Sequence, residues 1–231
     1  MNEVKLEHLL PELTPAEGKA LEVLWRLSDE QFDAGQFENS ATIMRVFSFL
    51  FPDDPRVLGN LGMALVCAGK HEEGLCHMER HALLAPHHVP CWLRYGAALV
   101  KSGKTLAAFA AFKKALSLES QNVDAMTMVA GTMMALNQSS AEAEKLLRQA
   151  IRLNPSHAGA WAHLGIALRC RKKWTEAEQA FKAAISLQPP PVVLQVIQEE
   201  LRRLNYGGCL ALNDTHIALG EDTPLTIKSG V

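Results

Sequence analysis

The side chains best suited to chemistry in this chain are histidines and cysteines gathered within residues 71–88. The six are His71, Cys76, His77, His81, His87 and His88. His77 and His81 are four residues apart, so on a helix both imidazoles would share one face and could bind one metal ion. The zinc-protease motif His-Glu-x-x-His is absent, because Leu75 stands where its second histidine should be. We therefore expect surface or packed histidines and no metal site.

A second candidate is Ser102-Gly103-Lys104-Thr105, which ends like a phosphate-binding loop. Such a loop needs another glycine five residues before the glycine of its Gly-Lys pair, and it follows a strand. Here that place holds Ala98, and the preceding pattern is helical. No serine, cysteine or carboxylate stands out as a nucleophile or general acid. The sequence thus predicts no catalytic residue and no cofactor.

Composition excludes several classes of partner. A formal net charge of −2 and a pI near 6.5 argue against nucleic acid, which needs a strongly basic face. The longest apolar run, residues 125–136, is shorter than the roughly 18 to 20 residues of a membrane-spanning helix. Residues 1–10 lack the apolar core of a signal peptide. The five cysteines are odd in number and scattered, unlike a disulfide framework. These features predict a cytoplasmic protein with no nucleic-acid partner and no membrane insertion.

The elements that position these side chains follow a repeat. Pro52, Pro86, Ser120, Pro155 and Pro189 stand 34, 34, 35 and 34 residues apart. A fixed period of this length indicates stacked helix-turn-helix units. The predicted units are residues 21–54, 55–88, 89–123, 124–157 and 158–190, with the one inserted residue expected near residues 121–124.

Small residues recur inside these units and predict close approach of the two helices. The eighth residue of each unit is Ser28, Gly62, Gly96, Gly131 and Gly165, and the twentieth is Ser40, Gly74, Ala108, Ala143 and Ala177. Bulky side chains at the fourth and twenty-fourth places would fill the remaining space, although Thr127 departs from this in the fourth unit. The fifteenth residues, near the turn where a positive φ is favoured, are Gly35, Gly69, Gly103, Gln138 and Lys172.

This pattern resembles the tetratricopeptide repeat over roughly residues 21–190, most closely in the third and fifth units. The resemblance implies an all-α, right-handed superhelical solenoid of five helix-turn-helix hairpins. Residues 1–20 would form an N-terminal arm or short helix, in which Thr14, Pro15 and Glu17 make a helix-start signature. Residues 191–205 would form an amphipathic capping helix, and residues 206–231 a flexible tail.

The same resemblance implies a binding site on the concave face, lined by the first helix of each unit. The groove is expected to include Trp25, Asp29, Phe32, Asn60, Met63, Val66, Cys67, Leu93, Arg94, Ala97, Val100, Lys101 and Met128. Flexible apolar side chains among a few charges suit an apolar segment of a protein or peptide client. A clamp for a C-terminal carboxylate is not expected, because Asp29 would repel one. Burial of this face against the arm, the tail or a second copy stays open, as does a homodimer through the arm.

A second resemblance runs from about residue 29 to residue 116. Residues 32–38, 50–54, 61–64 and 68–74 are similar to class II chaperones of bacterial type III secretion. Those chaperones hold hydrophobic translocator subunits in a groove made of three repeats, whereas this chain has five units, a capping helix and a tail.

The sequence therefore predicts a non-catalytic protein-binding module, a cytoplasmic chaperone or adaptor that holds an apolar client segment in its groove. Two alternatives stay open at this point. One is an assembly scaffold that bridges folded partners. The other is a metal- or redox-responsive regulator that uses the His71–His88 cluster with Cys67, Cys76 or Cys91.

Overall fold

The computed structural model describes residues 14–205, and all regular structure within them is helical, which confirms the all-α fold. The helices are α1 (Pro15–Asp33), α2 (Phe37–Leu50), α3 (Pro55–Cys67), α4 (His71–Leu84), α5 (Val89–Lys101), α6 (Thr105–Leu118), α7 (Val123–Ala135), α8 (Ser140–Leu153), α9 (Ala158–Cys170), α10 (Trp174–Ser186) and α11 (Pro191–Asn205). The predicted flexible tail, and the arm before residue 14, lie outside the described residues.

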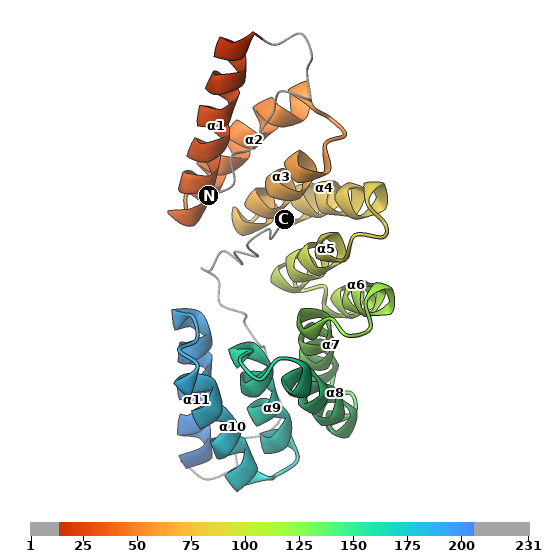
Figure 1. The fold of residues 1–231 in the computed structure, drawn as a ribbon, viewed down its shortest axis with the longest axis vertical. Helices are drawn as coiled ribbons and strands as arrows, with labels where there is room; N and C mark the ends of the chain where they lie inside the picture. The colour runs from red at the N-terminus through yellow and green to blue at the C-terminus, as the bar shows by residue number, and fades with distance from the viewer. Residues whose placement is uncertain (1–13, 206–231) are drawn as a thin grey trace. The chain divides into compact units, whose positions relative to one another are not determined.

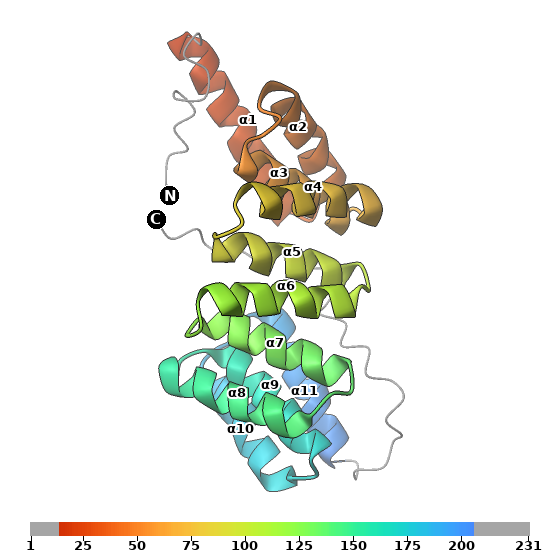
Figure 2. The ribbon, with the colours of Figure 1, turned by 90° about the vertical axis from the view of Figure 1, so that its right-hand side faces the viewer.

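The helices form two compact units. The first contains α1 to α4 and the second α5 to α11. Within each unit consecutive helices pack as pairs, α1 with α2 and α3 with α4 in the first, then α5 with α6, α7 with α8 and α9 with α10 in the second (Figure 1). Helix α11 packs against α10 and α9 and coincides with the predicted capping helix. Figure 2 shows the pairs of the second unit following one another in chain order. Five hairpins and a closing helix are thus confirmed.

The predicted helix-start signals are present. At α1 the backbone N–H of Thr14 donates to the Glu17 carboxylate at 2.8 Å, and the Thr14 hydroxyl accepts from the Glu17 N–H at 3.4 Å. At α3 the Asp54 carboxylate accepts from the Arg56 backbone N–H at 2.8 Å, ahead of Pro55 in the first helical turn. Both caps satisfy backbone donors that the helix itself leaves unpaired.

The extra residue of the array lies inside a hairpin and not between two hairpins. Helix α7 begins at Val123, and each loop that joins one hairpin to the next is four residues long. The turn between α7 and α8 covers residues 136–139, whereas the turn between α5 and α6 covers residues 102–104. The inserted residue therefore lies in the α7–α8 turn and not at residues 121–124, where the sequence predicted it.

This shift corrects two details of the fourth hairpin. The positive φ falls on Asn137, at 53°, and not on Gln138; asparagine tolerates this conformation better than most residues. The bulky residue of the fourth place is Met126, which is 1% exposed and shares a core with Leu147, so Thr127 does not replace it. The fourth hairpin is therefore regular in its packing and differs only in its turn.

The tightest contacts inside the hairpins join a glycine to a large side chain. A Cβ on Gly96 would lie 2.4 to 2.8 Å from ring atoms of Phe112, and a Cβ on Gly165 would lie 2.5 to 2.7 Å from ring atoms of Phe181. Gly62 has the same relation to Met78, at 2.7 Å. These pairs are the eighth and twenty-fourth residues of their repeats. The two helices of these three hairpins thus lie closer than any larger eighth residue would allow.

The first hairpin makes a polar version of the same close approach. Ser28 and Ser40 are both buried, and their hydroxyl oxygens are 3.0 Å apart. Because each hydroxyl has the other as a hydrogen-bonding partner, serine is tolerated here at places that are otherwise glycine or alanine.

Ion pairs between second helices repeat with the same spacing. Arg45 of α2 pairs with Glu73 of α4 at 2.8 Å, and Arg148 of α8 pairs with Glu176 of α10 at 2.8 Å. Both pairs join residues 28 apart and are exposed on both sides, so each is expected to contribute little to stability. Core burial, including the glycine contacts, must supply most of the stability.

The glycine contact can be tested with Gly165→Ala. The added Cβ would overlap the buried Phe181 ring, so the free energy of unfolding should fall by about 1 to 3 kcal/mol, even though alanine is the better helix former. Urea unfolding followed by circular dichroism measures the change. Gly18→Ala is the matched control, because a Cβ there meets nothing within 4 Å. Equal stability of Gly165→Ala and the natural chain would contradict the packing described.

Candidate functional site

The segment that resembles a phosphate loop is a helix-ending turn. Ser102, Gly103 and Lys104 lie between α5 and α6, and Gly103 has a φ of 73°. Their three backbone N–H groups donate to carbonyls in the last turn of α5 at 2.9 to 3.0 Å. A phosphate loop needs N–H groups that are available to its anion. These N–H groups instead end α5, so the structure offers no phosphate cradle here.

Of the three histidines of α4, His71 is exposed, whereas His77 and His81 face a packed environment. His81 is 5% exposed, and burial lowers the pKa of the half-buried His77. Between residues 14 and 205 no group of three or more His, Cys, Asp or Glu side chains is placed to hold a metal ion. The cysteines of this range, Cys67, Cys76, Cys91 and Cys170, are free thiols. The metal-responsive alternative draws no support from the described residues.

The predicted groove residues of α1 differ in accessibility. Trp25 is 5% exposed, lies edge-on to Phe47 with ring centroids 5.1 Å apart, and has the Arg56 guanidinium 5.9 Å from its ring centroid. Its ring therefore ties α1 to α2 and α3 and belongs to the core of the first unit. Asp29 is exposed and Phe32 is half-buried, so these two remain accessible.

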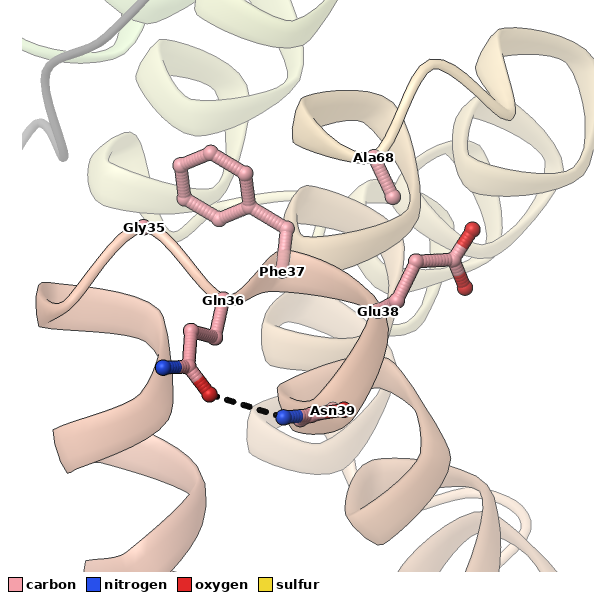
Figure 3. Close-up of a pocket in the computed structure, with 6 residues that line it drawn as sticks. All are labelled: Gly35, Gln36, Phe37, Glu38, Asn39 and Ala68. Atoms are coloured by element: carbon pink, nitrogen blue, oxygen red, sulfur yellow. Dashed lines mark hydrogen bonds between the residues drawn. The ribbon is translucent and has the colours of Figure 1, made fainter.

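Phe32 contacts Phe37, which lines a shallow hollow of about 360 Å³. Its ring lies edge-on to Phe37, with centroids 5.1 Å apart, and Phe37 lines the hollow together with Gly35, Gln36, Glu38, Asn39 and Ala68 (Figure 3). The side-chain amide of Asn39 donates to the side-chain Oε1 of Gln36 at 2.8 Å, and Glu38 pairs with Lys70 at 2.7 Å. Glu38, the titratable residue of the lining, is thus engaged in an ion pair, and the lining includes no nucleophile.

The predicted residues of α3 are mostly packing residues. Val66 is 2% exposed, and its side chain lies against Gly74 of α4, where a Cβ would be 2.7 Å from it. Met63 is 8% exposed, while Asn60 and Cys67 are half-buried. The accessible part of the predicted groove in the first unit is therefore Asp29 and Phe32 on α1 with Asn60 and Cys67 on α3.

In the second unit the predicted residues lie on α5 and α7. Leu93 and Ala97 are each 7% exposed and form the floor of the α5 face. Arg94, Val100 and Lys101 of α5 and Met128 of α7 are half-buried. Helix α6 packs against both α5 and α7, which places these two first helices on a common support.

The corresponding face of α9 is occupied by α11. Arg169, at the twelfth place of its repeat, pairs with Glu200 of α11 at 2.5 Å. Ile166, at the ninth place, is 7% exposed and belongs to the same core cluster as the fully buried Ile197 of α11. The capping helix thus lies on groove positions of the last repeat.

A histidine closes the face between α7 and α9. The ring of His163, at the sixth place of α9, lies against Gly131 of α7, where a Cβ would be 2.8 Å from its Nε2. Its Nδ1 donates to the Gly159 carbonyl at 2.9 Å, because a carbonyl can only accept. Sequence reasoning missed His163 and the Arg169–Glu200 pair; the groove register could have flagged His163 and Arg169. The accessible groove positions of the second unit are therefore those of α5 with Met128.

Comparisons with known proteins bear on this arrangement. Residues 68–173, a little under half of the chain, match the family described as the cilia and flagella-associated protein 70 middle TPR-like domain. The structure is similar to TTC0263, a thermophilic TPR protein of Thermus thermophilus, with a TM-score of 0.65, 17% identity, and coverage of 79% of this chain and 99% of that one. The chain has the tetratricopeptide repeat fold.

Other tetratricopeptide structures are similar at the same low identity. MamA of Desulfovibrio magneticus RS-1 has a TM-score of 0.59 and 17% identity, covering 73% of this chain and 94% of that one. YrrB, a TPR protein with an unusual peptide-binding site, has a TM-score of 0.54 and 15% identity, covering 76% and 90%. No curated protein sequence matches the chain. The tetratricopeptide fold suggests a protein-interaction module.

None of the described helices is both long and apolar enough to cross a membrane.

The His163 contact predicts a pH dependence of stability. Burial lowers the pKa of His163, and His157 lowers it further, against the effect of the hydrogen bond to the Gly159 carbonyl. Because the folded-state pKa lies below the unfolded value of about 6.5, the stabilisation should be complete above that pH and be lost as the pH falls below it. Urea unfolding at pH 7.5 and 5.5 should therefore show a smaller loss of stability in His163→Gln than in the natural chain.

The exposed His87 provides the control, since His87→Gln should keep the full loss between the two pH values. An identical pH dependence in His163→Gln and the natural chain would contradict the assignment.

Proposed function

We propose that this tetratricopeptide protein is a non-catalytic chaperone or adaptor that holds an apolar segment of a partner protein on its first-helix face. The observation that carries the proposal is the packing of α11 on α9. There the chain lays an amphipathic helix across groove positions of its own last repeat. The same positions of α5 form the best candidate for a partner in the second unit.

The α11 contact indicates the chemistry of that partner. Helix α11 presents Val193, Val196, Ile197, Leu201 and Leu204 to the core cluster and Glu200 to Arg169. On α5 the floor is Leu93 and Ala97, and Lys101 stands one place beyond the equivalent of Arg169. A segment with an apolar face and a carboxylate near one edge would complement this surface.

Energetics favour such a segment over a small molecule. Burial of apolar area contributes roughly 25 cal/mol per Å² removed from water, less the cost of ordering the segment. The floor of α5, Leu93 and Ala97, is apolar, and the hollow lined by Phe37 is shallow and belongs to the other unit. Area must therefore come from a long contact along the helices, which a protein segment provides.

Cellular context is part of the proposal. We place the protein in the cytoplasm, because the four cysteines of the described residues are free thiols. The peptide-binding site named for YrrB supports peptide capture by this fold. A type III secretion client is a prediction from the sequence resemblance alone, because none of the similar structures described above is named as a secretion chaperone.

One observation favours the scaffold alternative. Phe49 of α2 is 86% exposed and Leu83 of α4 is 65% exposed, and both occupy the same place in their repeats, 34 residues apart. Scattered apolar side chains are ordinary on a surface, but a pair in repeat register could serve a second partner. The test below distinguishes the two uses.

The test compares affinity capture by the natural chain and two variants from the cytoplasm of its own source. Met128→Glu places a charge on the half-buried groove residue of α7, while Leu106→Glu places one on α6, where the side chain is 68% exposed. Circular dichroism verifies that both variants fold. Partners should be lost with Met128→Glu and kept with Leu106→Glu, and their Kd should rise at least about tenfold, which corresponds to about 1.4 kcal/mol.

Retention of every partner by Met128→Glu would contradict groove binding. A third variant, Phe49→Glu, tests the scaffold alternative, which would replace the proposal if those partners were instead lost with it.

A further inference from the structure

Helix α11 covers a surface that the fifth hairpin has already formed (Figure 1). Inside that hairpin Gly165 of α9 packs on Phe181 of α10, which is fully buried. Among residues 191–204 of α11, Ile197 is fully buried and Glu200 is 7% exposed, whereas the other apolar residues on that side are half-buried. The hairpin therefore has a core of its own, and α11 lies on it as a less deeply buried helix.

The polar part of the α11 contact is a buried ion pair. Glu200 Oε2 lies 2.5 Å from Arg169 Nε without hydrogen-bond geometry, and Glu200 Oε1 accepts from Nη1 of Arg203 at 3.1 Å. Charged side chains lose hydration when they are buried, and a contact between them offsets this loss only when its geometry is good. The pair therefore contributes little net stability, yet it demands a carboxylate at this point of any helix that lies on α9.

The connection between α10 and α11 holds α11 through no backbone donor. It covers residues 187–190, and residues 189–191 are three prolines, which have no N–H. The N–H groups of Leu187 and Gln188 donate to carbonyls in the last turn of α10. The connection thus keeps α11 near the α9 face without fixing it there.

We propose that α11 is a displaceable occupant of the α9 face, and that a helix of a partner protein with the same side-chain pattern takes its place. The inference rests on the proposed function and adds to it a second binding surface and a partner class. In α11 the apolar residues that pack on the core cluster are Val193, Val196, Ile197, Leu201 and Leu204, and the carboxylate is that of Glu200. The partner helix would thus carry aliphatic residues at i, i+3, i+4, i+8 and i+11 and Asp or Glu at i+7.

Competition with α11 would make this binding selective. A helix that is tethered by a short connection has an effective concentration in the millimolar range, so a partner must bind the face well before it replaces α11. The apparent Kd of the partner equals its Kd for the open face divided by the fraction of molecules in which the face is open. Helices that lack the carboxylate, or whose apolar residues follow another spacing, are therefore excluded.

The test measures binding of a fluorescein-labelled peptide of residues 191–205 to the full chain by fluorescence anisotropy. In the natural chain α11 occupies the face, so the peptide should bind weakly. Glu200→Arg places a positive charge between Arg169 and Arg203 and should release α11, which lowers the Kd of the peptide at least about tenfold. Glu199→Arg makes the same change of charge on the exposed side of α11 and is the matched control, for which the Kd should stay at its natural value.

Two further variants test the same face independently. Ile197→Asp removes the buried apolar contact of α11 and leaves the ion pair in place, so it should also lower the Kd of the peptide at least about tenfold. Arg169→Glu added to Glu200→Arg exchanges the two charges. It should return the Kd to its natural value or higher, because α11 closes again and the carboxylate of the peptide meets another carboxylate. Circular dichroism verifies that each variant keeps its helices.

Two outcomes would overturn the inference. Equally tight binding to the natural chain, Glu200→Arg and Ile197→Asp would place the peptide on another surface. Undetectable binding to all three would make α11 a permanent part of the fifth hairpin. The capture test with Met128→Glu concerns α7 and does not involve α11, so failure of the proposed function and failure of this inference are told apart.

Discussion

The contact on which the rest of this structure depends is the approach of a glycine backbone to a large buried side chain inside a hairpin. Gly62 with Met78, Gly96 with Phe112, and Gly165 with Phe181 set the distance between the two helices of three hairpins. Packed interiors tolerate little change of volume, so this distance is narrowly fixed. The spacing in turn determines which side chains of each first helix point into the hairpin and which remain for a partner.

That constraint explains how the candidate surface is divided. In the second unit Leu93 and Ala97 lie at the base of α5, while α11 and His163 already fill the face of α9 and its junction with α7. The capping helix makes this kind of contact within the chain itself. Its apolar side and the Glu200 carboxylate lie on groove positions of the fifth repeat. A partner on α5 would use the same kind of contact two repeats earlier.

Much of the fold could be predicted because the repeat places small and large residues at fixed positions. The period located the five hairpins, and the turn glycines Gly35, Gly69 and Gly103 do have positive φ. Counting back from Pro155 puts the inserted residue before the fourth repeat and makes Gly131 its eighth residue, whereas the structure puts Ala130 there and gives Gly131 to the contact with His163. Local spacing could not show that Trp25 lies in the core or that Arg169 pairs with Glu200, since both depend on contacts between distant segments.

The central claim is that partners bind on the first helices and not on the second helices. Hydrogen–deuterium exchange of the full chain, with and without a saturating captured partner, tests it most directly. Slower exchange in α5 and the first half of α7, with α6 and α8 unchanged, is the result this account predicts. Protection confined to α6 and α8, or to the exposed face of α2 around Phe49, would contradict it.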